Sequence, residues 1–207
     1  MLDKSGFDLW ADNYDKSVSL SDDSNEYPFA GYKEILNSIF NIIMQKPNSK
    51  VLDVGIGTGV LSKRLYDYNH QIMGIDFSNK MLDICRSKMP KAKLIQHNFT
   101  NSIPYQIESS FFDYIVFSYS IHHLTNEQKI LLLNSLKNNI KSNSKIIIGD
   151  VSFQTKHDLI LCKKHFSSIW DDEEYYYSYD DIKSQLIYKN ISYTQISICS
   201  GLMVLSC

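Results

Sequence analysis

Three glycines at alternate positions follow a short apolar run, in the segment Val-Leu-Asp-Val-Gly-Ile-Gly-Thr-Gly at residues 51–59. Glycine lets the main chain turn sharply and approach a ligand closely, and the N-terminus of a following helix attracts polar groups. Asp76 ends the next apolar run, where a carboxylate can accept hydrogen bonds from both hydroxyls of a ribose. A tight turn and a helix-capping acid would explain each feature alone. Together they favour a site for a cofactor that contains a nucleoside.

The spacing of these glycines narrows the choice of cofactor. A dinucleotide fingerprint reads GxGxxG, and Val60 stands where its third glycine belongs; a P-loop needs Gly-Lys-Ser/Thr, which does not follow. Tyr179 and Lys183 have the Tyr-x-x-x-Lys spacing of short-chain dehydrogenases, but the TGxxxGxG turn of those enzymes is absent near the N-terminus. They are more simply an exposed pair one helical turn apart. A nicotinamide-dependent oxidoreductase remains an alternative.

Three further ionisable residues fall at predicted strand ends. His122 and His123 follow the fourth strand, and Asp150 ends the fifth, at the edge where open parallel sheets bind ligands. Adjacent residues in an extended or turning segment point in different directions, so we expect one histidine to pack and the other to face the cleft. We therefore predict no metal site. Each of the three is a candidate general base, and Asp150 could equally cap the next segment.

Apolar periodicity predicts the elements that position these residues. A helical pattern covers residues 27–46, with Pro28 in its first turn. Ser78 is expected to cap one later helix, and Thr125–Gln128 to form a capping box at the start of another. Short apolar runs predict strands at residues 50–54, 71–75, 93–97, 113–118 and 144–150. Strands that alternate with helices in this way predict a parallel sheet covered on both faces.

The end of the chain has a different pattern. Ile191–Ile198 and Leu202–Ser206 are apolar runs joined only by Cys199–Gly201. Parallel neighbours need a long crossover, so this short link predicts an antiparallel pair. No repeat or low-complexity linker divides the chain, and a single α/β domain over residues 1–207 is the economical interpretation.

Several segments, in order, resemble the class I S-adenosylmethionine-dependent methyltransferases of small bacterial type. VLDVGIGTG (51–59) is similar to the first motif of that family, GIDFS (74–78) to its second and IQHNF (95–99) to its third. FDYIVFSYSIHHL (112–124) resembles its fourth strand and turn, and FDLWADNYD (7–15) its W-A-x-x-Y-D segment. The resemblance implies a doubly wound, Rossmann-like, mainly parallel seven-stranded sheet with a C-terminal antiparallel hairpin. It also implies S-adenosylmethionine as cofactor and S-adenosylhomocysteine as product.

The resemblance assigns one group of residues to the methionyl and ribose parts of the cofactor. Asp53 and the backbone of Gly55, Gly57 and Gly59 would line the methionyl part. Asp76 would hold the ribose hydroxyls.

A second group is assigned to the adenine and to the reacting centre. Phe77 would flank the adenine, and Asn98 and the amide of Phe99 would bind its edge. Most relatives carry Asp where this chain has Asn98, whose neutral amide makes weaker hydrogen bonds than a carboxylate. Ser118 would lie beneath the sulfonium, and Tyr14 near the site of methyl transfer.

The resemblance also divides the domain into four parts. Residues 1–45 would form an N-terminal lid and helical segment, in which Trp10 and Tyr14 would close on the pocket together. The alternative is that both aromatics dock on the outer surface as an extension of the core. Residues 50–150 form the cofactor-binding core and 151–190 a substrate-side insertion, before the hairpin at 191–207. The acids and tyrosines of the insertion at residues 170–181 would suit an amine or a cation. A solvated acidic helix start is the simpler interpretation.

Composition limits the partners. The 207 residues include 21 Lys and Arg and 23 Asp and Glu, for a net charge of −2 at pH 7, without the basic excess of nucleic-acid or membrane binders. Four cysteines lie far apart, the first residues lack an apolar signal sequence, and no run approaches the ~20 residues of a membrane span. We expect a soluble cytoplasmic methyltransferase with a small-molecule acceptor. A non-catalytic cofactor-binding protein is the alternative outside the enzymes.

Overall fold

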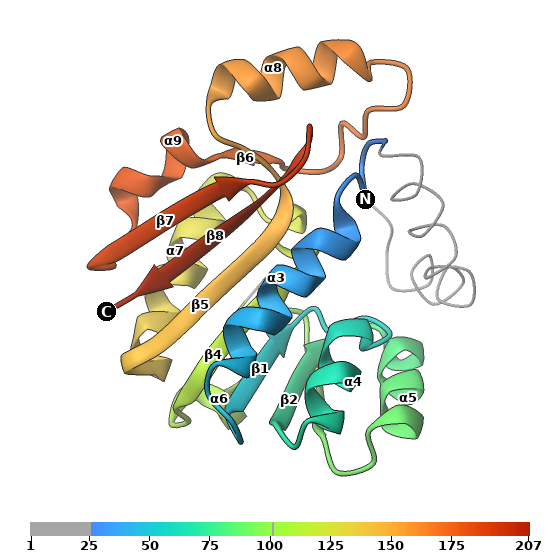
Figure 1. Cartoon of the computed structure of the whole chain (residues 1–207), viewed down its shortest axis with the longest axis vertical. Helices are drawn as coiled ribbons and strands as arrows, with labels where there is room; N and C mark the ends of the chain where they lie inside the picture. Colours follow the sequence, from blue (N-terminus) through green and yellow to red (C-terminus); the bar gives the residue numbers. More distant parts are fainter. Residues whose placement is uncertain (1–25, 101) are drawn as a thin grey trace.

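A twisted sheet with helices on both faces forms the body of the computed structural model (Figure 1), which describes residues 26–100 and 102–207. The seven strands that were predicted follow the order β3-β2-β1-β4-β5-β8-β7, and a short eighth strand, β6, pairs with β5. The strands are β1 (Lys50–Val54), β2 (Gln71–Asp76), β3 (Lys93–Gln96), β4 (Phe112–Ser118), β5 (Ile140–Phe153), β6 (Tyr177–Ser178), β7 (Asn190–Gln195) and β8 (Ser200–Ser206). The predictions for Trp10 and Tyr14 lie outside the described residues.

The predicted change of strand direction is confirmed. The five strands β1 to β5 run parallel, whereas β8 is antiparallel to both β5 and β7. The link between β7 and β8 is residues 196–199, because the amides of Ile196 and Ser197 turn back to the carbonyl of Ser200. The predicted bounds were therefore wrong at the turn: β7 ends before Ile198, whose side chain is exposed.

The helices form two layers, one on each face of the sheet (Figure 1). One layer contains α3 (Tyr32–Met44), α4 (Val60–Asp67) and α5 (Asn79–Lys88). The other contains α6 (Tyr105–Glu108), α7 (Asn126–Leu136) and α9 (Tyr179–Ile182). The helix α8 (Lys156–His165) lies beyond the carboxyl end of β5, and the 3₁₀ turns are η1 (Ile121–His123), η2 (Lys137–Asn139) and η3 (Lys183–Gln185). Within the described ranges, each helix is too short or too polar to cross a membrane.

Alternate residues of the central strands face the two layers. In β4, Tyr114 and Val116 belong to the apolar cluster beneath α3 and α4, whereas Ile115 and Phe117 belong to the cluster beneath α7. A strand buried on both faces needs a continuous apolar run. This is why the apolar runs in the sequence predicted the positions of β1 and β4 well.

The helix starts test the predictions about capping. Ser78 accepts a hydrogen bond from the amide of Met81 at 3.2 Å, and Thr125 and Gln128 form the predicted capping box. The periodicity predicts a helix that begins at Tyr27, but the first described helix begins at Tyr32. Gly31 takes a left-handed conformation (φ 77°) immediately before it.

Tyr27 belongs to an aromatic contact instead of the helix. Its ring stacks on Trp170 with 4.9 Å between ring centroids, and its hydroxyl lies 2.6 Å from that of Tyr176. Trp170 and Tyr176 both belong to the segment that follows α8. The start of the described chain is thereby attached to the predicted insertion at residues 151–190.

The close packing of α3 on β5 depends on Gly149. A β-carbon at this position would overlap the side chain of Ile35 and come within 3.0 Å of Ile39. We expect Gly149→Ala to lower the free energy of unfolding by roughly 1–3 kcal/mol, because overpacking forces neighbours off their preferred rotamers. Urea denaturation measures the change. Ser142→Ala, at an exposed position of the same strand, is the matched control and should change it by less than about 0.5 kcal/mol. Equal effects of both substitutions would contradict the packing argument.

Candidate active site

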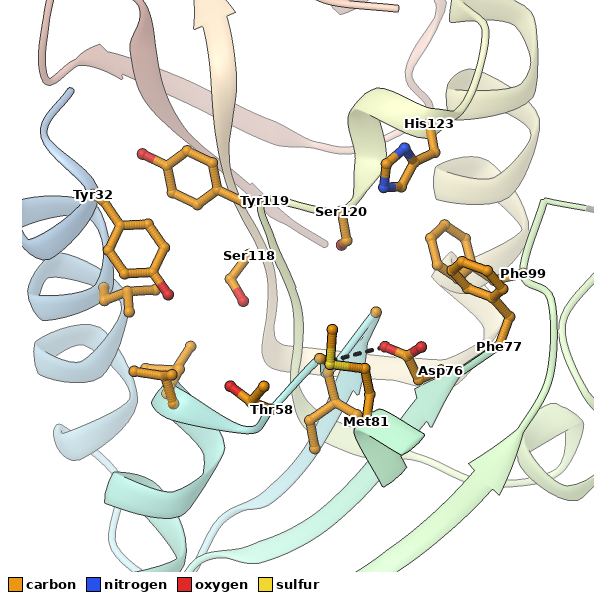
Figure 2. Close-up of a pocket in the computed structure, with 16 residues that line it drawn as sticks. Tyr32, Thr58, Asp76, Phe77, Met81, Phe99, Ser118, Tyr119, Ser120 and His123 are labelled. Atoms are coloured by element: carbon orange, nitrogen blue, oxygen red, sulfur yellow. Dashed lines mark hydrogen bonds between the residues drawn. The ribbon is translucent and has the colours of Figure 1, made fainter. Parts of the chain in front are cut away.

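A pocket opens at the carboxyl edge of the sheet, where β1, β2 and β4 end (Figure 2). Parallel sheets bind ligands at this edge because the loops that leave the strands gather there. Seven of the predicted site residues line the pocket: Gly55, Gly57, Asp76, Phe77, Phe99, Ser118 and His123. The sequence-based search missed others that line it, among them Tyr32, Thr58, Tyr119 and Ser120.

The three glycines of the first motif have left-handed backbones but different surroundings. A β-carbon on Gly57 would meet no atom within 4 Å, so this residue faces open space in the pocket. A β-carbon on Gly55 would collide with Ser120, and one on Gly59 would lie 2.9 Å from the sulfur of Cys85. Gly57 therefore allows close approach of a ligand, whereas Gly59 allows α4 and α5 to pack and does not line the pocket.

Asp76 sits at the end of β2 as predicted and is 6% exposed. One carboxylate oxygen accepts a hydrogen bond from the amide of Gly57 at 2.9 Å, and the other accepts one from the amide of Ser78 at 2.9 Å. These bonds fix the side chain beside the glycine loop (Figure 2). A carboxylate has about four acceptor sites, so Asp76 can also accept hydrogen bonds from a ligand.

Asp53, at the end of β1, is 1% exposed. One of its oxygens accepts a hydrogen bond from the hydroxyl of Ser62 at 2.6 Å, but Oδ1 is buried without a hydrogen-bond partner. Burial raises the pKa of Asp53 to about 7, Asp76 adds to this, and the bond from Ser62 opposes it. A buried acceptor without a partner is costly, and Asp53 is therefore ready for a donor or a cation.

The predicted adenine-binding residues are not all brought together. Phe77 and the buried Phe99 both line the pocket (Figure 2). Asn98 is exposed and does not line it; its side-chain carbonyl accepts hydrogen bonds from the amide and hydroxyl of Thr100 at 3.0 and 2.7 Å. The role predicted for Asn98 would require these bonds to be shared or exchanged. Ser118 lines the opposite side of the pocket.

Asp150 is fully buried and holds the turn after β4, but it does not end its strand as predicted, because β5 continues to Phe153. Its Oδ2 accepts hydrogen bonds from the amides of Ser120, Ile121 and His122 at 3.0, 2.9 and 3.3 Å. Its Oδ1 accepts from the amide of Val151 at 2.7 Å and from Nδ1 of His122 at 2.6 Å. Burial alone would raise the pKa of Asp150, but these donors and the charge of His122 hold it below its usual range. Asp150 thus caps η1 and does not line the pocket.

The two histidine rings lie close together, contrary to the prediction that they point apart, although one packs and the other faces the pocket as predicted. Their ring centroids are 4.2 Å apart, because both residues lie in one 3₁₀ turn. Nδ1 of His123 donates to Oε2 of Glu174 at 3.0 Å, and Nε2 of His122 lies 3.8 Å from the same oxygen. His123 lines the pocket, whereas His122 is held against Asp150.

The pKa values of the two histidines are shifted in opposite directions. Burial opposes protonation of His122, but the charge and hydrogen bond of Asp150 outweigh it and raise the pKa of His122. Burial and the neighbouring His122 lower the pKa of His123, although Glu174 opposes them. The same histidines hold the pKa of Glu174 below its usual value against the effect of burial.

Lys129 is a fully buried cation that the sequence-based search also missed. Its ammonium donates hydrogen bonds to the carbonyls of Leu124 and Tyr175. Burial lowers the pKa of Lys129 to about 8, although Asp150 and Glu174 raise it. The amide of Tyr175 donates to the carbonyl of His122 at 2.8 Å. Residues 170–176, which we call the cover segment, are therefore attached to the turn after β4.

The fold and this site together indicate a class of protein. A parallel sheet with a reversed last pair of strands, and a glycine loop beside an acid at its carboxyl edge, are typical of enzymes that bind a nucleoside-containing cofactor. A family model described as a methyltransferase domain matches residues 45–196.

Curated relatives agree with the family model over nearly the whole chain. An uncharacterized methyltransferase of Alkaliphilus oremlandii is 33% identical over 195 residues, which are 91% of this chain and 88% of the relative. An uncharacterized methyltransferase of Oceanobacillus iheyensis is 31% identical over 82% of this chain and 80% of its own length. The chain belongs to the family of methyltransferase domains, and the prediction of a methyltransferase is confirmed.

Solved structures share the fold at low sequence identity. Magnesium protoporphyrin IX methyltransferase from Synechocystis, with bound SAH, matches with a TM-score of 0.66 and 16% identity over 86% of this chain and 84% of that chain. A DhpI–SAM–HEP complex matches with a TM-score of 0.69 and 14% identity over 98% and 95%. These likenesses confirm the predicted Rossmann-like architecture.

The raised pKa of Asp53 predicts how stability depends on pH. A group that binds its proton more tightly in the folded state stabilises the fold at low pH, and this contribution is lost as the pH rises through the folded pKa. Without ligand, the wild type should lose up to about 1.4 kcal/mol per pH unit relative to Asp53→Asn between the unfolded value near 4 and the folded value, which is about 7. Ser62, Asp76 and Cys85 face the group from α4, β2 and α5 and are unchanged in the variant.

Thermal unfolding at pH 5.5, 7 and 8.5 measures this difference. The free energy of unfolding of Asp53→Asn, relative to the wild type, should increase from pH 5.5 to pH 7 and level off above pH 7. Asp113→Asn is the matched control, because the pKa of Asp113 is held low by Lys46 and by the amide of Lys50, against burial. A difference for Asp53→Asn that does not vary with pH would show that this carboxyl does not titrate near neutrality.

Proposed function

We propose that this chain binds S-adenosylmethionine in the pocket between the glycine loop and Phe99, and transfers its methyl group to a small-molecule acceptor. The observation that carries the proposal is the position of Asp76, which is fixed beside the open backbone of Gly57. This combination offers an ionised acceptor for ribose hydroxyls and a place for the cofactor to approach the main chain.

The residues present fit this cofactor. Gly57 forms an open cradle that a β-carbon would begin to fill. Asp53 supplies a buried acceptor without a partner at the base of the same loop, which suits the ammonium end of a methionyl group. Phe77 and Phe99 offer aromatic surface to an adenine (Figure 2). Tyr14, outside the described residues, stays a prediction.

When bound, the cofactor supplies an activated methyl group on a sulfonium, which is the difficult part of the chemistry. The residues of the chain have to orient the reactants. Holding two reactants in line can lower a barrier by roughly 7–11 kcal/mol. Ser118 and Tyr119 border the pocket on one side and His123 on another (Figure 2), so the acceptor would enter between them. Of the three candidate catalytic residues, His123 lines the pocket, and His122 and Asp150 support it.

A small acceptor is supported by what surrounds this entrance. The cover segment lies against η1 through Tyr175, and its Trp170 and Tyr176 pack on Tyr27. The cover segment does not line the pocket but stands beside the turn that carries His123, where it would hinder the approach of a macromolecular acceptor. Asp171, Asp172 and Glu173 are exposed on it, and their charges would repel nucleic acid.

The role of Asp76 can be tested by binding alone. Asp76→Asn should weaken binding of S-adenosylhomocysteine at least about tenfold, because hydrogen bonds to a charged group contribute roughly 1.5–3 kcal/mol each. Isothermal titration calorimetry measures the affinity. Asp83→Asn, which removes an exposed carboxylate from α5, should leave it unchanged. If Asp76→Asn binds as tightly as the wild type, the ribose is held elsewhere.

The acceptor class requires a turnover experiment. We expect purified protein with methyl-labelled S-adenosylmethionine to label the low-molecular-weight fraction of a bacterial extract. The protein and nucleic-acid fractions of the same extract should stay unlabelled. Asp76→Asn serves as the inactive control. Label confined to macromolecules would overturn the small-molecule proposal. Cofactor binding without any labelled product would favour the non-catalytic alternative.

A further inference from the structure

Three potential metal ligands converge where the cover segment meets η1. Nδ1 of His123 lies 3.0 Å from Oε2 of Glu174, and Nε2 of His122 lies 3.8 Å from that oxygen. Each of the three residues offers one ligand atom that lies within 4.8 Å of those of the other two. Two of the residues are neighbours in one turn, and the third comes from a distant segment, so the fold itself brings this set together.

We propose that His122, His123 and Glu174 bind a divalent transition-metal ion, with Zn²⁺ as the ion that fits best. Two neutral imidazoles and one carboxylate form the ligand set of many catalytic zinc sites, which keep a further position open. This proposal differs from the prediction made from the sequence, which was that the chain has no metal site. That expectation assumed that the two histidines point apart.

The spacing of the three atoms suits a single ion. Zn²⁺ lies about 2.0–2.2 Å from nitrogen and oxygen ligands in tetrahedral sites, so ligand atoms are roughly 3.4 Å from one another. The separations of 3.0 and 3.8 Å lie on either side of this value. Binding would require His123 to carry its proton on Nε2 instead of Nδ1, which is a change of tautomer without a change of charge.

Asp150 supports the site in the way that outer-shell carboxylates support bound metals. It accepts the proton of Nδ1 of His122 at 2.6 Å, so the ion would bind Nε2 of that ring and release to solvent the proton that Nε2 carries when His122 is charged. A ligating histidine commonly has such a partner, because the bond fixes both its tautomer and its orientation. Four backbone amides hold Asp150 in turn, so His122 is rigidly placed.

The position of the site indicates what an open coordination position would bind. His123 lines the cofactor pocket, and Glu174 lines a second hollow beneath Trp170 and Tyr176. The ion would therefore lie between the cofactor and the space for the acceptor. This part of the inference rests on the proposed function: the acceptor would be a compound with an ionisable S–H or O–H group. On coordination its proton would go to solvent, and no electron would be transferred.

A network of hydrogen bonds and charges without an ion is the competing explanation. Lys129, held by the carbonyls of Leu124 and Tyr175, already offsets part of the negative charge of Asp150 and Glu174. The two explanations make opposite predictions about stoichiometric metal binding. They can be separated without knowing the acceptor.

The test uses the full chain, freed of any affinity tag and of metal by a chelator. We expect calorimetry to show one Zn²⁺ per chain with a dissociation constant below micromolar. Co²⁺ should give the intense visible absorption of a four- or five-coordinate site, and Zn²⁺ should displace it. A small thiol should shift the Co²⁺ spectrum if a position is open. Because these measurements need neither cofactor nor turnover, their failure is distinct from a failure of the proposed function.

Matched substitutions locate the site. His123→Gln and Glu174→Gln should each weaken Zn²⁺ binding more than about 100-fold, because loss of an outer-shell partner alone costs 10- to 100-fold. His157→Gln on α8 and Glu173→Gln beside the site alter exposed residues and should leave affinity unchanged. Absence of stoichiometric binding to the wild type would overturn the proposal even if a variant failed to fold. Binding that survives both ligand substitutions would overturn it as well.

Discussion

The buried carboxylate of Asp150 is the constraint on which the acceptor side of this methyltransferase depends. It lies within β5, which continues to Phe153 instead of ending at residue 150 as predicted, and it would be costly to bury without partners. Four backbone amides and His122 satisfy it, and three of those amides belong to the turn after β4. The turn has its observed shape because the charge must be neutralised there. That shape then places His123 at the pocket and brings the two histidines together.

The cofactor side is built by a different kind of constraint. There the shape of the site depends on the backbone. Gly57, in a left-handed conformation, faces the cavity, and the carboxylate of Asp76 holds the loop by accepting a hydrogen bond from the amide of Gly57. The two sides meet across the pocket, between Phe99 and Tyr119. Tyr119 is itself a non-glycine residue with a positive φ of 51°, a conformation that is uncommon and concentrated at functional sites.

The sequence could predict the features that depend on local patterns. The bounds predicted for β1 are those observed, and the capping box at Thr125 and the reversed hairpin were also found. Each depends on periodicity, a cap or a short link. By contrast, nothing local marks Glu174 as a partner of His123, which lies 51 positions earlier. The burial of Lys129, on a helix with little amphipathic pattern, likewise depends on carbonyls contributed by other segments. Contacts of this kind arise only when the sheet has assembled.

The way in which the cover segment is attached has a consequence for divergence among related enzymes. Tyr175 makes both of its connections through the main chain, since its amide donates to His122 and its carbonyl accepts from Lys129. Any residue other than proline could make the same two bonds. The side chains around it can therefore be replaced during evolution while the segment keeps its place against the turn after β4. Such an arrangement lets a family acquire new acceptors by drift at a few exposed positions, with no change to the architecture beneath.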